Sequence, residues 1–103
     1  MKLKLRFLIA LLATLPASNA IALDGADLYA KKTCFACHGK DANTPILPIY
    51  PKIAGQNRDY LAAQMRDIKS GDRANGQSAA MKGVMHLVSD EEIDAIADYL
   101  STL

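Results

Sequence analysis

The sequence is poor in several residue types on which large classes of protein depend. Its 103 residues include two cysteines and no tryptophan, and 12 Lys and Arg almost cancel 11 Asp and Glu. Two cysteines form at most one disulfide, which excludes a small disulfide-framework protein. The length excludes folds that need a few hundred residues and leaves room for one domain. A domain of this size buries little apolar surface, so we expect something besides side chains to complete its core.

The sequence also lacks a hydrophobic run long enough to cross a bilayer. Its most apolar stretch, Phe7–Leu15, is much shorter than the ~20 residues that a membrane-spanning helix needs. Basic residues precede this stretch, and a proline and several small residues follow it. This order is typical of a secretory signal peptide, whereas an uncleaved membrane anchor is the weaker alternative. We therefore predict a signal peptide over residues 1–22, cleaved after Ala20 or Ala22, and a mature domain over residues 23–103.

Removal of residues 1–22 would change the charge of the chain, because they carry three basic residues and no acidic ones. Residues 23–103 have a net charge of −2 and no basic stripe. A binder of nucleic acid or of anionic lipid would need a basic surface. We therefore expect neither kind of partner, and no membrane span after cleavage.

Helical spacing and capping residues predict an all-α domain. We expect three main helices, over Asp24–Thr33, Arg58–Ser70 and Asp90–Leu103. Asn57 is a favourable N-cap for the second helix, and Gly71 would stop it. Ser89 and Glu92 have the spacing of a capping box at the start of the third. No segment alternates apolar and polar residues over several positions, so strands are not expected.

Two long segments separate these helices, residues 39–56 and 71–88. The first has a proline at every third position from Pro45 to Pro51, a spacing that a polyproline ligand for another domain would also show. We interpret it instead as a stiff loop around a bound group. Its larger aliphatic residues would then turn inward: Ile46, Leu47, Ile49 and Ile53. Loops of this length are uncommon in compact domains unless they have a function, and wrapping a large apolar cofactor would be one.

Residues Cys34 to His38 form a Cys-x-x-Cys-His pattern, the attachment signature of c-type haem. Each cysteine sulfur can form a thioether with one vinyl group of the porphyrin, and His38, next to Cys37, can ligate the iron. The alternatives are a thioredoxin-like redox pair, a zinc site and a structural disulfide. The first normally follows a strand, the second needs more ligands than the remaining His86 supplies, and the third would close a very short loop. The pattern therefore predicts one covalently attached haem c held by Cys34, Cys37 and His38.

The mature chain resembles a small single-haem class I c-type cytochrome, and more narrowly one half of the periplasmic di-haem cytochromes of that class. The residues that carry the resemblance are Gly25, Leu28 and Tyr29, the segment 34–39, Tyr50–Gln56, Tyr60–Leu61, Met81, the segment 87–93 and Ala97–Leu100. The resemblance implies an all-α fold in which long loops wrap the haem and the first and last helices cross. Gly25 would permit the close approach of these helices, and Tyr99 or Leu100 would pack at the crossing.

Four side chains are candidates for the other axial position of the iron: Met65, Met81, Met85 and His86. Met65 has the spacing of a core residue of its helix, and His86 is more simply a surface residue. In the family pattern the methionine ligand lies eight residues before the serine that caps the last helix, which corresponds to Met81. The resemblance therefore implies that His38 and Met81 ligate the iron, with Met85, His86 or an open site as alternatives. Methionine opposite histidine favours the ferrous state and raises the reduction potential.

The resemblance also implies contacts around the haem. The carbonyl of Pro45 would accept the second N–H of His38, and Gln56 and Arg58 could face the haem propionates. Arg58 could equally be a solvated residue in the first turn of its helix.

Taken together, these features predict a periplasmic protein that carries one electron between redox partners and is not an enzyme. We expect transient contacts with other redox proteins and a monomeric chain. A haem-bearing subunit of a larger dehydrogenase and an open-site haem sensor or enzyme are the alternatives with the same cofactor. A thiol-disulfide module is the alternative without it.

Overall fold

The computed structural model describes residues 22–103, so the predicted signal peptide, apart from Ala22, lies outside the described residues. The helices are α1 (Gly25–Lys31), α2 (Phe35–His38), α3 (Arg58–Ser70), α4 (Ser78–Met85) and α5 (Asp90–Ser101). Residues 22–103 contain no strand, which agrees with the predicted all-α class. Within the same residues, no helix has the length and apolarity needed to cross a membrane.

The capping residues place the three predicted helices well. Helix α3 has the predicted bounds: the Asn57 side chain accepts from two backbone N–H groups at its start, and Gly71, with φ 92°, ends it. The capping box of Ser89 and Glu92 is formed at the start of α5. Helices α1 and α5 each end two residues earlier than predicted. In α1 the reason is local, because Thr33 adopts the left-handed region with φ 63°.

Helices α2 and α4 were not predicted from the sequence. Helix α2 is a single turn within the Cys-x-x-Cys-His segment. Helix α4 occupies part of the segment 71–88, for which we expected only a loop. It starts without a side-chain cap and contains Gly83, so it lacks the usual local signals of a helix.

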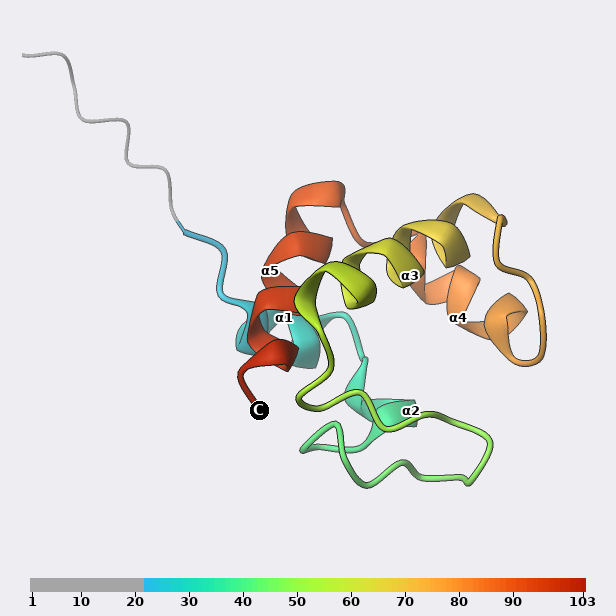
Figure 1. Ribbon diagram of the computed structural model, residues 1–103, viewed down its shortest axis with the longest axis horizontal. Helices are drawn as coiled ribbons and strands as arrows, with labels where there is room; N and C mark the ends of the chain where they lie inside the picture. The colour runs from blue at the N-terminus through green and yellow to red at the C-terminus, as the bar shows by residue number, and fades with distance from the viewer. Residues whose placement is uncertain (1–21) are drawn as a thin grey trace, which may run out of the picture.

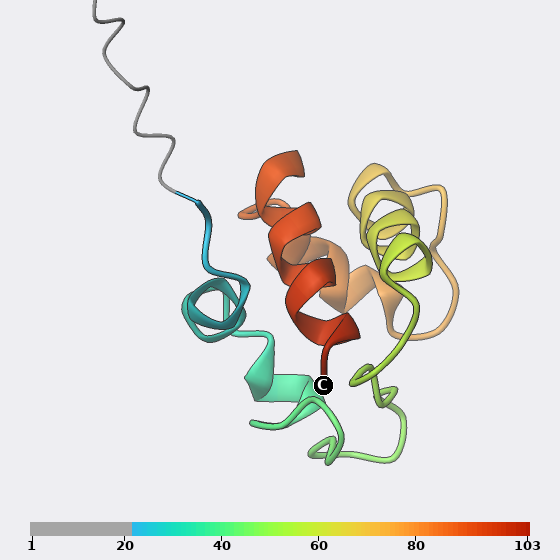
Figure 2. The same cartoon turned by 60° about the vertical axis from the view of Figure 1, so that its left-hand side comes forward.

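The first and last helices cross, as the family resemblance implied (Figures 1 and 2). Gly25 of α1 lies directly against α5, where a Cβ atom would come within 2.1 Å of the Ala95 carbonyl oxygen and 2.6 Å of the Tyr99 Cβ. One turn later, the rings of Tyr29 and Tyr99 pack with their centroids 6.0 Å apart. Leu100 is buried on the same helix. A residue without a side chain is therefore required at position 25.

Gly25→Ala should destabilise the domain by about 1–3 kcal/mol, since the added methyl group forces the two helices apart. Urea unfolding of the haem-loaded protein measures this change. Gly83→Ala is the matched control: a Cβ at Gly83 meets nothing within 4 Å, and alanine favours a helix interior. Equal stability of the two variants would contradict the close crossing.

The core forms between α3, α4 and α5, with α1 packed on the far side of α5 (Figure 2). Its most deeply buried side chains lie on α5 and just before it: Val88, Ile93, Ile96, Ala97 and Leu100. Helix α2 and the loop that follows it lie together on one side of these helices (Figure 1). Residues from both parts line one cavity, which is described below.

The loop after α2 differs from prediction in the direction of two of its aliphatic residues. Ile46 and Leu47 are 62 and 47% exposed, whereas Ile53 is partly buried and Ile49, although 59% exposed, lines the cavity described below, as expected. The interior position is taken by Ala42, which is fully buried and whose carbonyl accepts the N–H groups of Ile53 and Ala54. These backbone bonds hold the base of the loop in the interior, whereas Pro48 at its tip is exposed.

Candidate functional site

A cavity of about 460 Å³ lies between α2 with its following loop and the three packed helices. Both cysteines and His38 line it from one side, and α3, α4 and α5 contribute mainly aliphatic side chains and methionines from the other. Its size is within the range of small-molecule and cofactor sites, and its apolar lining suits a flat apolar ligand. The structure thus brings the residues of the Cys-x-x-Cys-His pattern to one cavity.

Cys34 and Cys37 lie at the two ends of one helical turn and are both free thiols that line the cavity. Burial raises the pKa of the Cys34 thiol to about 11, so this thiol is protonated at neutral pH. A redox-active cysteine pair needs a lowered thiol pKa, since the thiolate is the reactive form. The raised pKa counts against the thiol-disulfide alternative.

The imidazole of His38 is buried and held by the backbone. Its Nδ1 lies 2.9 Å from the carbonyl oxygen of Pro51. A carbonyl only accepts, so Nδ1 carries the proton and Nε2 keeps the lone pair that a metal ion needs. The expectation of Pro45 as acceptor was wrong. The Ile46 N–H bonds to the Cys37 carbonyl, which ties the start of the loop to α2, and the chain reaches the imidazole only on its return at Pro51.

The position of the Pro51 carbonyl is fixed by two further contacts of the loop. Ala42 holds the backbone of Ile53 and Ala54, and the Gly55 N–H donates to the Leu100 carbonyl at 2.8 Å. On the other side of the motif, the buried Tyr29 hydroxyl donates to the Gly39 carbonyl. The segment that bears His38 is therefore anchored to both α1 and α5. Burial also raises the pKa of Tyr29 well above its ordinary value, which keeps this hydroxyl a donor.

Three methionines line the cavity: Met65 on α3, and Met81 and Met85 on α4. Met85 is 3% exposed and belongs to the hydrophobic core, whereas Met81 is only partly buried. Met81 was expected in a loop and instead lies inside α4, one turn before Met85 on the same face. His86 is exposed and does not line the cavity.

No cluster of three His, Cys, Asp or Glu side chains that could hold a metal ion occurs among residues 22–103. A tetrahedral zinc site normally draws its four ligands from such side chains. The described part of the chain therefore offers no support for the zinc alternative.

The family model for cytochrome c matches residues 22–103. The chain belongs to the cytochrome c family. It is 36% identical over 86 residues to cytochrome c-553 of Nitratidesulfovibrio vulgaris, with 84% of this chain and 82% of the relative covered. It is 40% identical over 70 residues to cytochrome c-554(548) of Halomonas halodenitrificans, with 68% and 83% covered. Cytochrome c4 of Pseudomonas aeruginosa is 44% identical over 69 residues, which are 67% of this chain and 32% of that protein.

Family membership identifies the protein as a small class I c-type cytochrome whose cofactor is covalently attached haem c with its iron. The cavity fits this group. Two free thiols lie one helical turn apart, an oriented imidazole lies beside them, and thioether side chains line the opposite helices.

Two lysines hold the turn that joins α4 to α5 in this cytochrome. Lys32, which follows α1, donates to the Leu87 carbonyl at 2.8 Å, and Lys69 of α3 donates to the next carbonyl, that of Val88. The turn comes directly after the helix that bears Met81 and Met85. Its attachment to two other helices therefore fixes the position of the methionines relative to the cavity.

Of the two expectations for Arg58, the surface residue in the first turn of its helix is confirmed. Arg58 does not line the cavity: its guanidinium pairs with Asp59, Asp94 and Asp98. Gln56 does line it, as expected. Arg73, which was not among the predicted site residues, also lines the cavity. Its place in a polar loop gave no signal for a position beside the cofactor.

Proposed function

We propose that this cytochrome carries one electron at a time between redox proteins in the periplasm. Cys34 and Cys37 would form the two thioethers with the haem, and His38 and Met81 would ligate the iron from opposite sides. The bound haem supplies a one-electron couple of the iron. The chain holds its ligands, excludes water from the cavity and limits rearrangement when the charge changes.

The observation that carries this proposal is the placement of ligand-type side chains on both sides of one cavity. His38 lies on α2 and Met81 on α4, and separate parts of the fold hold them. An iron with two protein ligands has no open position for a substrate, so we propose a carrier and not an enzyme. The soft methionine sulfur would favour Fe(II) and set a raised potential.

The periplasmic location is proposed from the signal-peptide pattern of residues 1–22. One relative, from Stutzerimonas stutzeri, is named thiosulfate dehydrogenase electron acceptor and is 34% identical over 70 residues. The relation supports a redox enzyme as one class of partner. We propose transient contacts and a monomeric carrier.

A haem-bearing subunit of a larger dehydrogenase is a second candidate. The exposed aliphatic side chains of Ile46 and Leu47 favour it, because adjacent apolar residues exposed on one loop are typical of a protein contact. Co-purification of this chain with a dehydrogenase in constant proportion would favour the subunit, and its isolation alone would favour the free carrier.

The proposal is tested on the protein exported from a bacterium that attaches haem c. We expect a red protein that keeps its colour in acidified acetone, with a mass increased by one haem. A redox titration should fit one electron, and its reduced-minus-oxidised spectrum should be that of a low-spin c-type haem. A colourless folded protein, or a titration of two electrons at the cysteines, would contradict the proposal.

A further inference from the structure

Arg73 is a cationic side chain beside an otherwise mainly apolar cavity. It follows α3, and its backbone N–H donates to the Asp67 carbonyl at 3.0 Å. Its guanidinium donates to the side-chain oxygen of Gln64 at 3.0 Å, in a partly buried contact. Both the backbone and the side chain of Arg73 are therefore oriented by α3.

The partners of Arg73 differ from those of the two arginines on the surface of α3. Arg58 and Arg66 each pair with carboxylates of α5, whereas Arg73 has no carboxylate within 4.0 Å among residues 22–103. No Asp or Glu of these residues lines the cavity, and the only other cation that does is the exposed Lys52. A partly buried guanidinium with one neutral partner is costly, and an anionic ligand would offset this cost.

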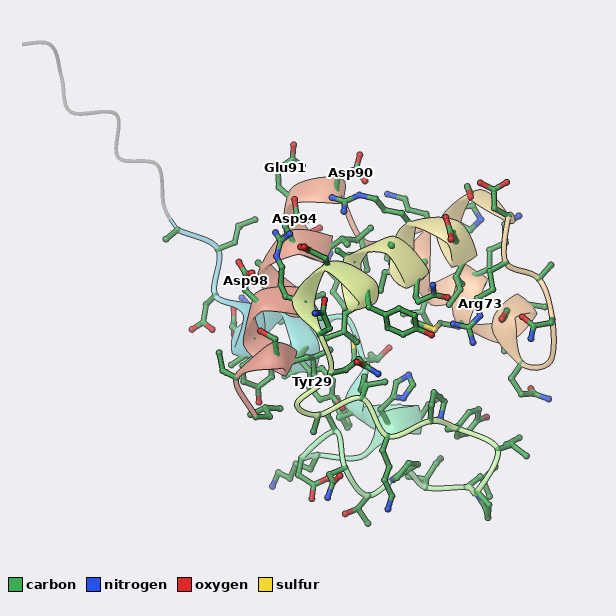
Figure 3. All side chains as sticks on the ribbon, in the orientation of Figure 1. Tyr29, Arg73, Asp90, Glu91, Asp94 and Asp98 are labelled. Carbon is green, nitrogen blue, oxygen red and sulfur yellow. The ribbon has the colours of Figure 1, made fainter. Side chains whose placement is uncertain are left out.

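Haem brings two carboxylates of its own. They lie on the edge of the porphyrin opposite the carbons that form the thioethers. Cys37 lies in α2 and Cys34 directly before it, whereas Arg73 belongs to the connection between α3 and α4, away from α2 (Figure 3). We propose that Arg73, oriented by Gln64, binds a haem propionate. This inference rests on the proposed function, which places the haem in this cavity.

The contact would do two things. The guanidinium would neutralise a carboxylate near the iron, which raises the reduction potential because a nearby negative charge stabilises Fe(III). It would also keep the propionate ionised at neutral pH. The charged groups that face the cavity from its walls are Arg73 and Lys52. The titratable ones are Tyr29 of α1, Cys34, Cys37 and His38 of α2, Tyr50 of the loop and Tyr60 of α3.

The test is the midpoint potential of the purified holoprotein, measured as a function of pH. Arg73→Gln should lower the midpoint potential. It should also raise, by about one to three units and into the neutral range, the pH at which the potential begins to fall. Arg73→Lys should retain most of the potential. Arg66→Gln is the matched control and should change neither quantity, because Arg66 does not line the cavity.

The inference is overturned if Arg73→Gln leaves both quantities as in the wild type, or if Lys52→Gln produces the shifts instead. Should Arg73→Gln fail to accumulate, Gln64→Leu serves in its place, with a smaller upward shift expected and none as the opposing result. The near-infrared band of a methionine-ligated ferric haem separates the two proposals. If the band is present in the wild type while the Arg73 variants show no shift, the proposed function stands and only the Arg73 contact fails.

Discussion

The variant with both Cys34 and Cys37 changed to Ala should be colourless and largely unfolded. Without the haem, the apolar walls of the 460 Å³ cavity would lose their contents. Cavities in protein cores cost about 24 cal/mol per Å³, which gives an upper bound of roughly 11 kcal/mol here. That value is comparable with the whole stability of a small domain. Far-UV circular dichroism and the yield of exported protein measure the effect.

Phe35→Ala is the matched control for this variant. Phe35 lies between the two cysteines and is 45% exposed, so its removal alters the same segment without altering the attachment. It should give a red, folded protein. A double cysteine variant that is colourless but as helical and as stable as Phe35→Ala would show that haem attachment and folding are not coupled.

Met81→Ala should open the iron, and Met85→Ala should not. Both side chains line the cavity from the same face of α4. The two variants therefore remove a methionine from consecutive turns of one helix. In Met81→Ala we expect loss of the near-infrared band of the ferric protein, binding of carbon monoxide when reduced and a lower potential. In Met85→Ala these properties should be kept, while stability falls by about 2–5 kcal/mol because Met85 is a core residue.

If Met85→Ala loses the band and binds carbon monoxide while Met81→Ala does neither, Met85 is the ligand. The ligand then lies one helical turn later than the family pattern implies. If both variants keep the band and reject carbon monoxide, neither methionine is the ligand, and Met65 becomes the remaining methionine of the cavity. Absorption spectra and urea unfolding of the two variants, measured side by side, distinguish these cases.

The parts of the fold that local sequence signals describe were predicted well. Asn57, Gly71 and the pair Ser89 and Glu92 are capping residues whose effect depends only on nearby backbone groups, so they place α3 and the start of α5. Gly25 was recognised through the family resemblance, and its contact with Ala95 explains why it is required. Helix α4 lacks a cap, so its existence depends on packing against α3, which the sequence alone does not express.

The site was predicted where its residues are adjacent in sequence and missed where they meet only in space. Cys34, Cys37 and His38 follow each other at fixed spacing, and they line one cavity. The acceptor for His38 was placed at Pro45 because proline positions alone do not show where a loop turns back. Arg73 comes to the cavity only because its guanidinium is held by Gln64 of α3.

The proposed carrier depends on one haem in this cavity that is closed by protein ligands on both sides. Its most direct test is to add carbon monoxide to the reduced wild-type protein at neutral pH and to record the absorption spectrum. A closed iron predicts a spectrum that does not change. Rapid formation of a carbon monoxide complex would contradict the carrier and indicate an open-site sensor or enzyme.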